Sequence, residues 1–168
     1  RASALAADAV ATMVGCAGAG APDARLAAVK ALLNFTQGEC KEDARVWQCI
    51  RPLSEIGEPE LQRYALMALA NLSTGSDAVK AQLLQNQIGR VCARIIGAQD
   101  MQLNVATQAL RVLMPLSTAS CKAELAADEQ LVDALAGILR DPAARLRLAS
   151  LKTPAEKAVA AQAHKASV

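Results

Sequence analysis

Two asparagines, Asn34 and Asn71, stand at matching places in two similar stretches of the sequence. The first stretch, residues 20–38, reads GAPDARLAAVKALLNFTQG, and the second, residues 57–75, reads GEPELQRYALMALANLSTG. A side-chain amide both donates and accepts hydrogen bonds, so it can cap a turn, fill a polar place in a core or bind a ligand. Because the asparagines recur together with their surroundings, their role belongs to a repeated unit.

Apolar residues recur at helical spacing in these two stretches and in a third. In the second stretch they are Leu61, Ala65, Ala68, Leu69 and Leu72, which share one face of a helix. The same offsets, 37 residues earlier and 44 residues later, again give only apolar residues: Ala24, Ala28, Ala31, Leu32, Phe35, Val105, Ala109, Val112, Leu113 and Leu116. The periodicity predicts three equivalent amphipathic helices that bury the same face.

Each of these helices follows another apolar run, and short polar helical stretches stand between the units. The apolar runs are residues 4–15, 43–57, 87–97 and 129–139, and the short stretches are residues 76–86 and 119–127. A fourth copy of the repeated helix begins at residues 142–151. The sequence therefore predicts about four units, over residues 3–37, 38–75, 76–118 and 119–152, each with one short and two longer helices.

Prolines and glycines mark where these helices begin and end. Pro22, Pro59 and Pro142 stand at first-turn positions, where a missing amide hydrogen costs nothing. The glycine-rich stretch GCAGAG, residues 15–20, follows a helix, and we expect it to be a linker between helices. Thr153, Pro154 and Glu156 form a helix-start signal, which predicts a capping helix or tail over residues 153–168.

The composition agrees with an all-α chain. Of the 168 residues, 53% are hydrophobic, 20% are charged and only 2% are aromatic. A core of alanine, leucine, valine and isoleucine with few rings suits closely packed helices better than sheets. Trp47 is the single tryptophan, and its place in the second helix of a unit predicts a core position.

The units resemble the armadillo repeat. The resemblance rests on a length of about forty residues, on a third helix ending in ALLNFT (31–36) or ALANLS (68–73), and on an entry through Gly-x-Pro, and it covers residues 3–151. It implies a right-handed α-solenoid whose third helices line a concave groove, with HEAT-like repeats as the alternative architecture. In the best-known armadillo proteins an asparagine ladder at the positions of Asn34 and Asn71 binds the main chain of an extended peptide, while many other members keep this asparagine for local structure.

This sequence departs from the armadillo pattern in two ways. The third unit has Pro115 at the ladder position, which breaks the ladder and is expected to bend the helix. One turn before the ladder, nuclear-import adaptors of this family have tryptophans, whereas this chain has Lys30, Met67 and Arg111. A receptor for nuclear-localisation signals is therefore disfavoured, and whether the asparagines serve local structure or a ligand stays open.

The predicted partner-binding groove consists of residues that the repeat places beside the buried stripe: Lys30, Asn34, Arg63, Met67, Asn71, Asn104, Gln108 and Arg111. Three of them are cations and none is a carboxylate. This pattern favours an extended or helical partner segment of acidic or amphipathic character, although three solvated cations are also ordinary on a helical surface.

Other function classes find little support in the sequence. The single histidine, His164, lies outside the repeats, and no catalytic serine elbow or phosphate-binding loop is present, so we expect neither an enzyme nor a cofactor. The five scattered cysteines include no CxxC pair, which predicts reduced thiols and no metal site. No apolar run is long enough to cross a membrane.

The net charge of +2 disfavours nucleic acid, although residues 140–168 hold six Lys or Arg against two carboxylates. We therefore expect a cytoplasmic, non-catalytic scaffold or adaptor that holds protein partners on its concave face. The alternative is a structural subunit of a large cytoskeletal, for example ciliary, or ribonucleoprotein assembly. The chain begins with Arg1 and an uncovered apolar helix, so we expect it to be part of a longer chain or complex.

Overall fold

The computed structural model describes residues 2–37, 44–98, 100, 102–118 and 121–141 of the chain. Over these ranges every regular element is a helix, so the all-α prediction is confirmed. The chain divides into two compact units, residues 1–135 and 136–168. The second unit is described only over residues 136–141, where the last helix ends, and the expected repeat at 142–151, Pro142, and the expected capping helix at 153–168 lie outside the described residues.

The described helices follow the predicted order of apolar runs and short polar stretches. They are α1 (Ala2–Ala19), α2 (Pro22–Phe35), α3 (Ala44–Leu53), α4 (Pro59–Leu72), α5 (Asp77–Gln85), α6 (Ile88–Ile96), α7 (Leu103–Leu116), α8 (Lys122–Ala126) and α9 (Glu129–Arg140). The three repeated helices are α2, α4 and α7, each of 14 residues. The two short polar stretches are α5 and α8.

The helices begin where the sequence signals predict. Pro22 and Pro59 are the first residues of α2 and α4, where the missing amide hydrogen breaks no helical hydrogen bond. The hydroxyl of Ser76 caps α5 by accepting a hydrogen bond from the amide of Val79, at 3.4 Å. Local sequence therefore fixes these three starts.

The prediction of a linker at residues 15–20 was wrong, because α1 continues as a helix through Ala19. Glycine weakens a helix, but α1 packs against α2 and α3 and buries Val10 and Ala17, and this packing keeps the segment helical. The chain turns at Gly20, whose amide donates to the carbonyl of Cys16 at 2.9 Å. A Cβ atom at Gly20 would lie 2.4 Å from that carbonyl oxygen, so the turn requires glycine.

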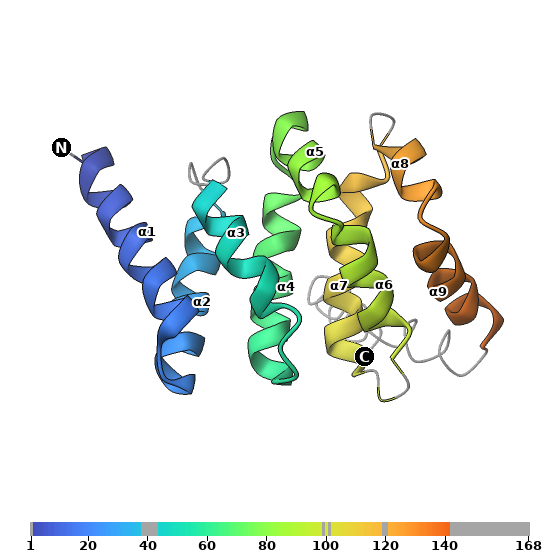
Figure 1. Cartoon of the computed structure of the whole chain (residues 1–168), viewed down its shortest axis with the longest axis horizontal. Helices are drawn as coiled ribbons and strands as arrows, with labels where there is room; N and C mark the ends of the chain where they lie inside the picture. Colours follow the sequence, from blue (N-terminus) through green and yellow to red (C-terminus); the bar gives the residue numbers. More distant parts are fainter. Residues whose placement is uncertain (1, 38–43, 99, 101, 119–120, 142–168) are drawn as a thin grey trace, which may run out of the picture. The chain divides into compact units, whose positions relative to one another are not determined.

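Within the first unit, the repeated helices pack side by side (Figure 1). α4 contacts α2 on one side and α7 on the other. α1 packs on α2 and α3, while α3 covers α4 and α6 covers α7. The core therefore lies between α2, α4 and α7 and the helices that precede them in the sequence.

The predicted apolar stripe forms this core. All five stripe positions of α4 and all five of α7 are buried. In α2 the stripe residues Ala28 and Leu32 are buried, Ala31 and Phe35 are half-buried, and Ala24 in the first turn is exposed. Trp47 is buried as expected, with 6% of its surface exposed.

Replacing Leu69 by alanine should destabilise the protein strongly. Leu69 is fully buried in α4, so the substitution removes buried methyl groups and leaves a cavity, at a cost of about 2 to 5 kcal/mol in the free energy of unfolding. Urea denaturation measures this change. Met114→Ala on α7 is the control, because the Met114 side chain is 69% exposed and should contribute little. Equal midpoints for the two variants would contradict the assigned register of α4.

Three thiols differ in their exposure and acidity. Cys16 is exposed, Cys49 is half-buried with its sulfur donating to the carbonyl of Val14 at 3.6 Å, and Cys92 is buried in α6. Burial raises the pKa of the Cys92 thiol from 9.0 to about 12 because the thiolate would lose its hydration. Burial also raises the pKa of Cys49.

The protein should lose stability in alkaline solution through Cys92. The unfolded state releases the thiol proton above pH 9.0, whereas the folded state keeps it until about pH 12, so the stabilisation present below pH 9.0 declines across that interval. The free energy of unfolding should therefore fall more between pH 8 and pH 10.5 in the parent than in Cys92→Ala, by about 1 to 2 kcal/mol. Denaturant titrations at both pH values test this. Parallel losses in the two proteins would contradict it.

Candidate functional site

The predicted groove residues lie on the three adjacent repeated helices. α2 carries Lys30 and Asn34, α4 carries Arg63, Met67 and Asn71, and α7 carries Asn104, Gln108 and Arg111. All eight side chains are exposed or half-buried, and α4 packs against both other helices. We call these eight residues the α2-α4-α7 face.

Lys30 on this face has a carboxylate partner that sequence reasoning missed. Its ammonium group lies 3.1 Å from Oε1 of Glu60, in the first turn of α4. The predicted set of groove residues contained no carboxylate. Glu60 lies beside them in the structure, and its negative charge lowers the positive charge of the face. The helical spacing of Glu60 to Arg63 and Met67 could have revealed it, because residues three and seven apart lie on one side of a helix.

Tyr64 lies between two cations of the face. The Lys30 ammonium and the Arg63 guanidinium are each 4.7 Å from the centroid of its ring. Such cation–π contacts hold long side chains against an aromatic surface. Lys30, Glu60, Arg63 and Tyr64 therefore form one connected cluster that joins α2 to α4.

The two asparagines differ in what they do. Asn71 donates from Nδ2 to the hydroxyl of Thr36, at 3.1 Å, and Thr36 is itself buried and donates to the carbonyl of Leu33 at 2.7 Å. Asn71 thus ties α4 to the C-terminal end of α2, which is a structural role. Asn34 is exposed, and its side chain has no hydrogen-bond partner among the residues that the structure describes.

A hydroxyl residue follows each repeated helix and was not noticed in the sequence. Thr36, Ser73 and Ser117 each donate to the carbonyl three residues earlier, at 2.7, 2.8 and 2.7 Å. Their spacing is that of the repeat itself, which is the signal that could have found them. Each hydroxyl satisfies a carbonyl that the end of the helix leaves without an intrahelical donor.

The α7 part of the face is polar. Arg111 donates to Oε1 of Gln108 at 3.1 Å, and Asn104 is exposed. α7 runs through Pro115 and ends at Leu116, so the proline lies in its last turn. Pro115 has no amide side chain, so it cannot donate a hydrogen bond to the hydroxyl of Ser73 as Asn71 does to that of Thr36.

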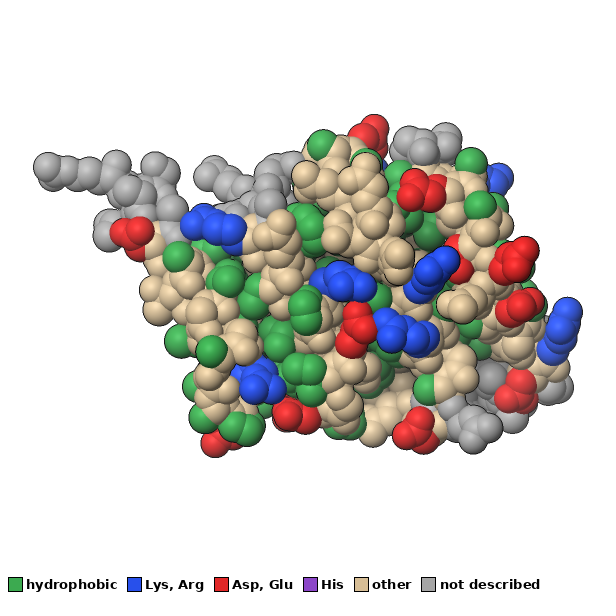
Figure 2. Space-filling view, in the orientation of Figure 1, with side chains coloured by type: hydrophobic (Ala, Val, Ile, Leu, Met, Phe, Trp, Pro, Cys, Tyr) green, Lys and Arg blue, Asp and Glu red, His purple; other side chains and the backbone are tan. Residues whose placement is uncertain are grey.

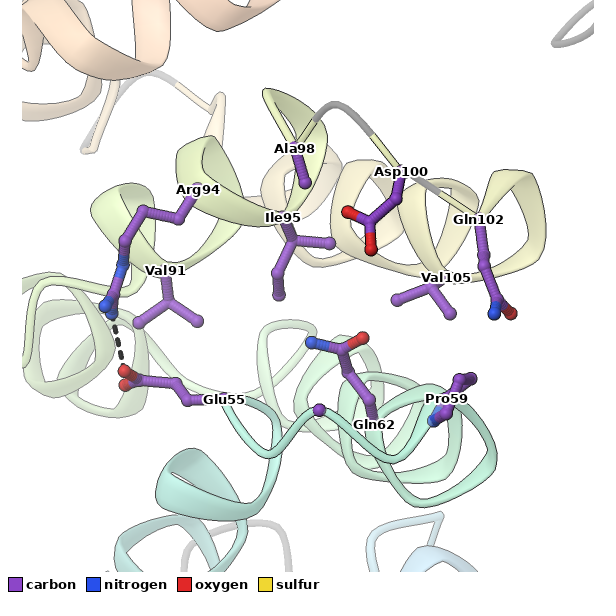
Figure 3. A pocket seen from close by; sticks show the side chains of 11 residues that line it. Glu55, Pro59, Gln62, Val91, Arg94, Ile95, Ala98, Asp100, Gln102 and Val105 are labelled. Atoms are coloured by element: carbon purple, nitrogen blue, oxygen red, sulfur yellow. Dashed lines mark hydrogen bonds and ion pairs between the residues drawn. The ribbon is translucent and has the colours of Figure 1, made fainter.

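A cavity lies between two helix turns (Figure 3). It has a volume of about 280 Å³ and is lined by residues of the α3–α4 turn, α6 and the α6–α7 turn, with the first turns of α4 and α7: Glu55, Gly57, Pro59, Gln62, Val91, Arg94, Ile95, Ala98, Asp100, Gln102 and Val105. We call it the turn cavity. Its lining comes from two stretches far apart in the sequence, residues 55–62 and 91–105, so no local sequence pattern marks it.

Charged side chains of both signs are interspersed over the side of the first unit where α3 and α6 lie (Figure 2). Glu55 is the centre of one network there, because it accepts from Arg94 at 2.5 Å and lies 3.4 Å from Arg51. The alternation of charges gives this surface no broad positive patch for a phosphate backbone.

The chain matches no protein-family model, and no curated protein or solved structure is significantly similar to it. Among the described residues, no helix is at once long enough and apolar enough to cross a membrane. In the same ranges, no three histidine, cysteine, aspartate or glutamate side chains come together as metal ligands would.

The two asparagines should respond differently to removal. Asn71→Ala breaks the hydrogen bond to Thr36, leaves a buried hydroxyl with fewer partners and should cost about 1 kcal/mol of unfolding free energy. Asn34→Ala is the matched control, and it should change stability by less than about 0.5 kcal/mol because its side chain is exposed. Denaturant unfolding compares them. Equally small changes in unfolding free energy for the two variants would contradict a structural role for Asn71.

Proposed function

We propose that this protein is a non-catalytic scaffold or adaptor that binds a segment of a partner protein on the α2-α4-α7 face. In this proposal the chain is a right-handed α-solenoid of about four armadillo-type repeats. The side-by-side packing of α2, α4 and α7 supports it, because this packing aligns the outer sides of three equivalent helices. Such stacked repeats present extended surfaces for binding.

The observation that carries the proposal is the mixed chemistry of the α2-α4-α7 face. Tyr64 and Met67 are half-buried and offer apolar surface in its middle, on α4. Asn34 and Asn104 offer exposed amides that can donate to and accept from the main chain of a peptide. An interface with an apolar centre and a polar rim is what a partner segment of mixed character requires.

In this proposal, the acidic part of the partner lies along α4 and α7. Lys30 is already paired with Glu60, so its charge is largely compensated. Arg63 contacts the Tyr64 ring and Arg111 contacts a neutral amide, so neither has a carboxylate partner in the described residues. Their charges remain for carboxylates of a partner.

The absence of a reacting constellation on this face supports a binding role over catalysis. Its eight side chains are amides, cations and a thioether, the adjoining Glu60 and Tyr64 add a carboxylate and a phenol, and the exposed thiol Cys16 lies elsewhere, on α1. In this proposal the thiols are reduced and the protein acts in the cytoplasm. A role in a cytoskeletal assembly would use the same kind of binding surface.

Site-specific crosslinking tests the face directly. A photoreactive benzoylphenylalanine at Met67 should crosslink a partner segment, and the same residue at Gln48, which is exposed on α3, should not. Mass spectrometry of the crosslink identifies the segment, and the corresponding synthetic peptide then serves as ligand for affinity measurements.

Reversing two charges of the face should weaken the binding of that peptide. Arg63→Glu with Arg111→Glu should lower the affinity about ten-fold or more, because two attractions become repulsions. Arg90→Glu with Lys122→Glu makes the same charge change at exposed sites of α6 and α8 and should leave the affinity unchanged. Titration calorimetry measures both. Loss of affinity in the control pair alone would move the binding site away from the α2-α4-α7 face.

A further inference from the structure

The turn cavity combines an apolar floor with polar groups at its rim (Figure 3). Val91 and Ile95 of α6 and Val105 of α7 supply aliphatic surface, and Pro59 closes one end. The carboxylate of Asp100 and the amide of Gln62 point into the cavity from opposite sides. None of these residues belongs to the α2-α4-α7 face, so the inference below stands independently of the proposed function.

Two acceptors in the cavity have no partner among the described residues, the amide oxygen of Gln62 and the carboxylate of Asp100. Nε2 of Gln62 donates to the carbonyl of Ser54 at 2.8 Å, which leaves the Gln62 amide oxygen as the group with unused capacity. Arg94, the single cation in the lining, is held by Glu55 at 2.5 Å. Asp100 has no hydrogen-bond or ion-pair partner within the part of the chain that the structure describes.

We propose that the turn cavity binds the side chain of a lysine from a partner protein. The four methylene groups of lysine match the aliphatic floor, and its ammonium group carries three donors on a flexible stem. Acceptors on two opposite sides suit this compact tetrahedral group better than a planar guanidinium, which prefers a single carboxylate in a fork geometry. The volume of about 280 Å³ is sufficient for one such side chain.

The charges and helix ends around the cavity make Asp100 decisive. The lining holds Glu55, Arg94 and Asp100, and Glu55 is paired with both Arg94 and Arg51. The positive N-terminal ends of α4 and α7 oppose a cation, while the carbonyl end of α6 favours one. Because the paired charges and the helix ends together give no net attraction for an ammonium group, that attraction depends on the carboxylate of Asp100.

Titration of the folded protein with a blocked lysine tests the proposal. N-acetyl-lysine methylamide represents a lysine within a chain, and N-acetyl-norleucine methylamide has an aliphatic stem without the charge. In spectra of the methyl groups and side-chain amides, the lysine probe should shift Ile95, Val105 and Gln62 saturably, with millimolar affinity as expected for so small a ligand. The norleucine probe should shift them much less.

Two substitutions and a control complete the test. Asp100→Asn should weaken the lysine probe about five-fold or more by removing the charge partner, and its exposed position makes unfolding a minor risk. Ala98→Leu, at an exposed position in the turn, should fill the cavity and exclude the probe. Asp8→Asn, at an exposed position of α1, should bind the probe as the parent does.

Several results would overturn the proposal. They are the absence of saturable shifts at the cavity, equal affinities for the charged and neutral probes, or unchanged affinity in a folded Asp100→Asn protein. These results would leave the proposed role of the α2-α4-α7 face untouched, because its test uses other residues and another ligand.

Discussion

The close packing of α4 between α2 and α7 is the constraint on which the rest of the first unit depends. Ala65, Ala68 and Leu69 of α4 are fully buried, and the small alanine side chains let neighbouring helices approach closely. A single amphipathic helix cannot bury its apolar stripe alone, so each repeated helix needs a neighbour of the same kind. Once the stripe is buried, the face that remains exposed is determined, and it is the face that carries Lys30, Met67 and Arg111.

Polar contacts set the register of this packing, and they differ between the two helix pairs. Between α2 and α4, Asn71 holds Thr36 and Lys30 holds Glu60, so the pair is fixed at both ends of α4. Between α4 and α7 the position equivalent to Asn71 is Pro115, and the hydroxyl of Ser73 is satisfied within its own chain segment by the carbonyl of Ala70. The buried apolar stripes of α4 and α7 hold this pair together, over a more extensive contact than that between α2 and α4.

The sequence predicted what depends on local periodicity and missed what depends on contacts between units. The stripe from Leu61 to Leu72 and the helix starts at Pro22 and Pro59 follow from residues within one helix, and they were confirmed. The segment at residues 15–20 was misread because its glycines suggest a linker, whereas burial of Ala17 against other helices keeps it helical. The role of Asn71 depends on Thr36, a residue 35 positions earlier, and the turn cavity requires residues 55–62 and 91–105 together, so neither could be read from one stretch.

Equivalent positions of the repeated helices differ in how much their side chains vary. Leu32, Leu69 and Leu113 occupy equivalent buried positions and are identical, because each fills the same space between stacked helices. The equivalent positions beside the buried stripe hold Lys30, Met67 and Arg111, three side chains with different chemistry. The packing therefore repeats while the surface does not. Under the proposed function, a partner along several helices would meet a different group at each one, and discrimination between partners would come from the sum of these contacts, because each contributes little by itself.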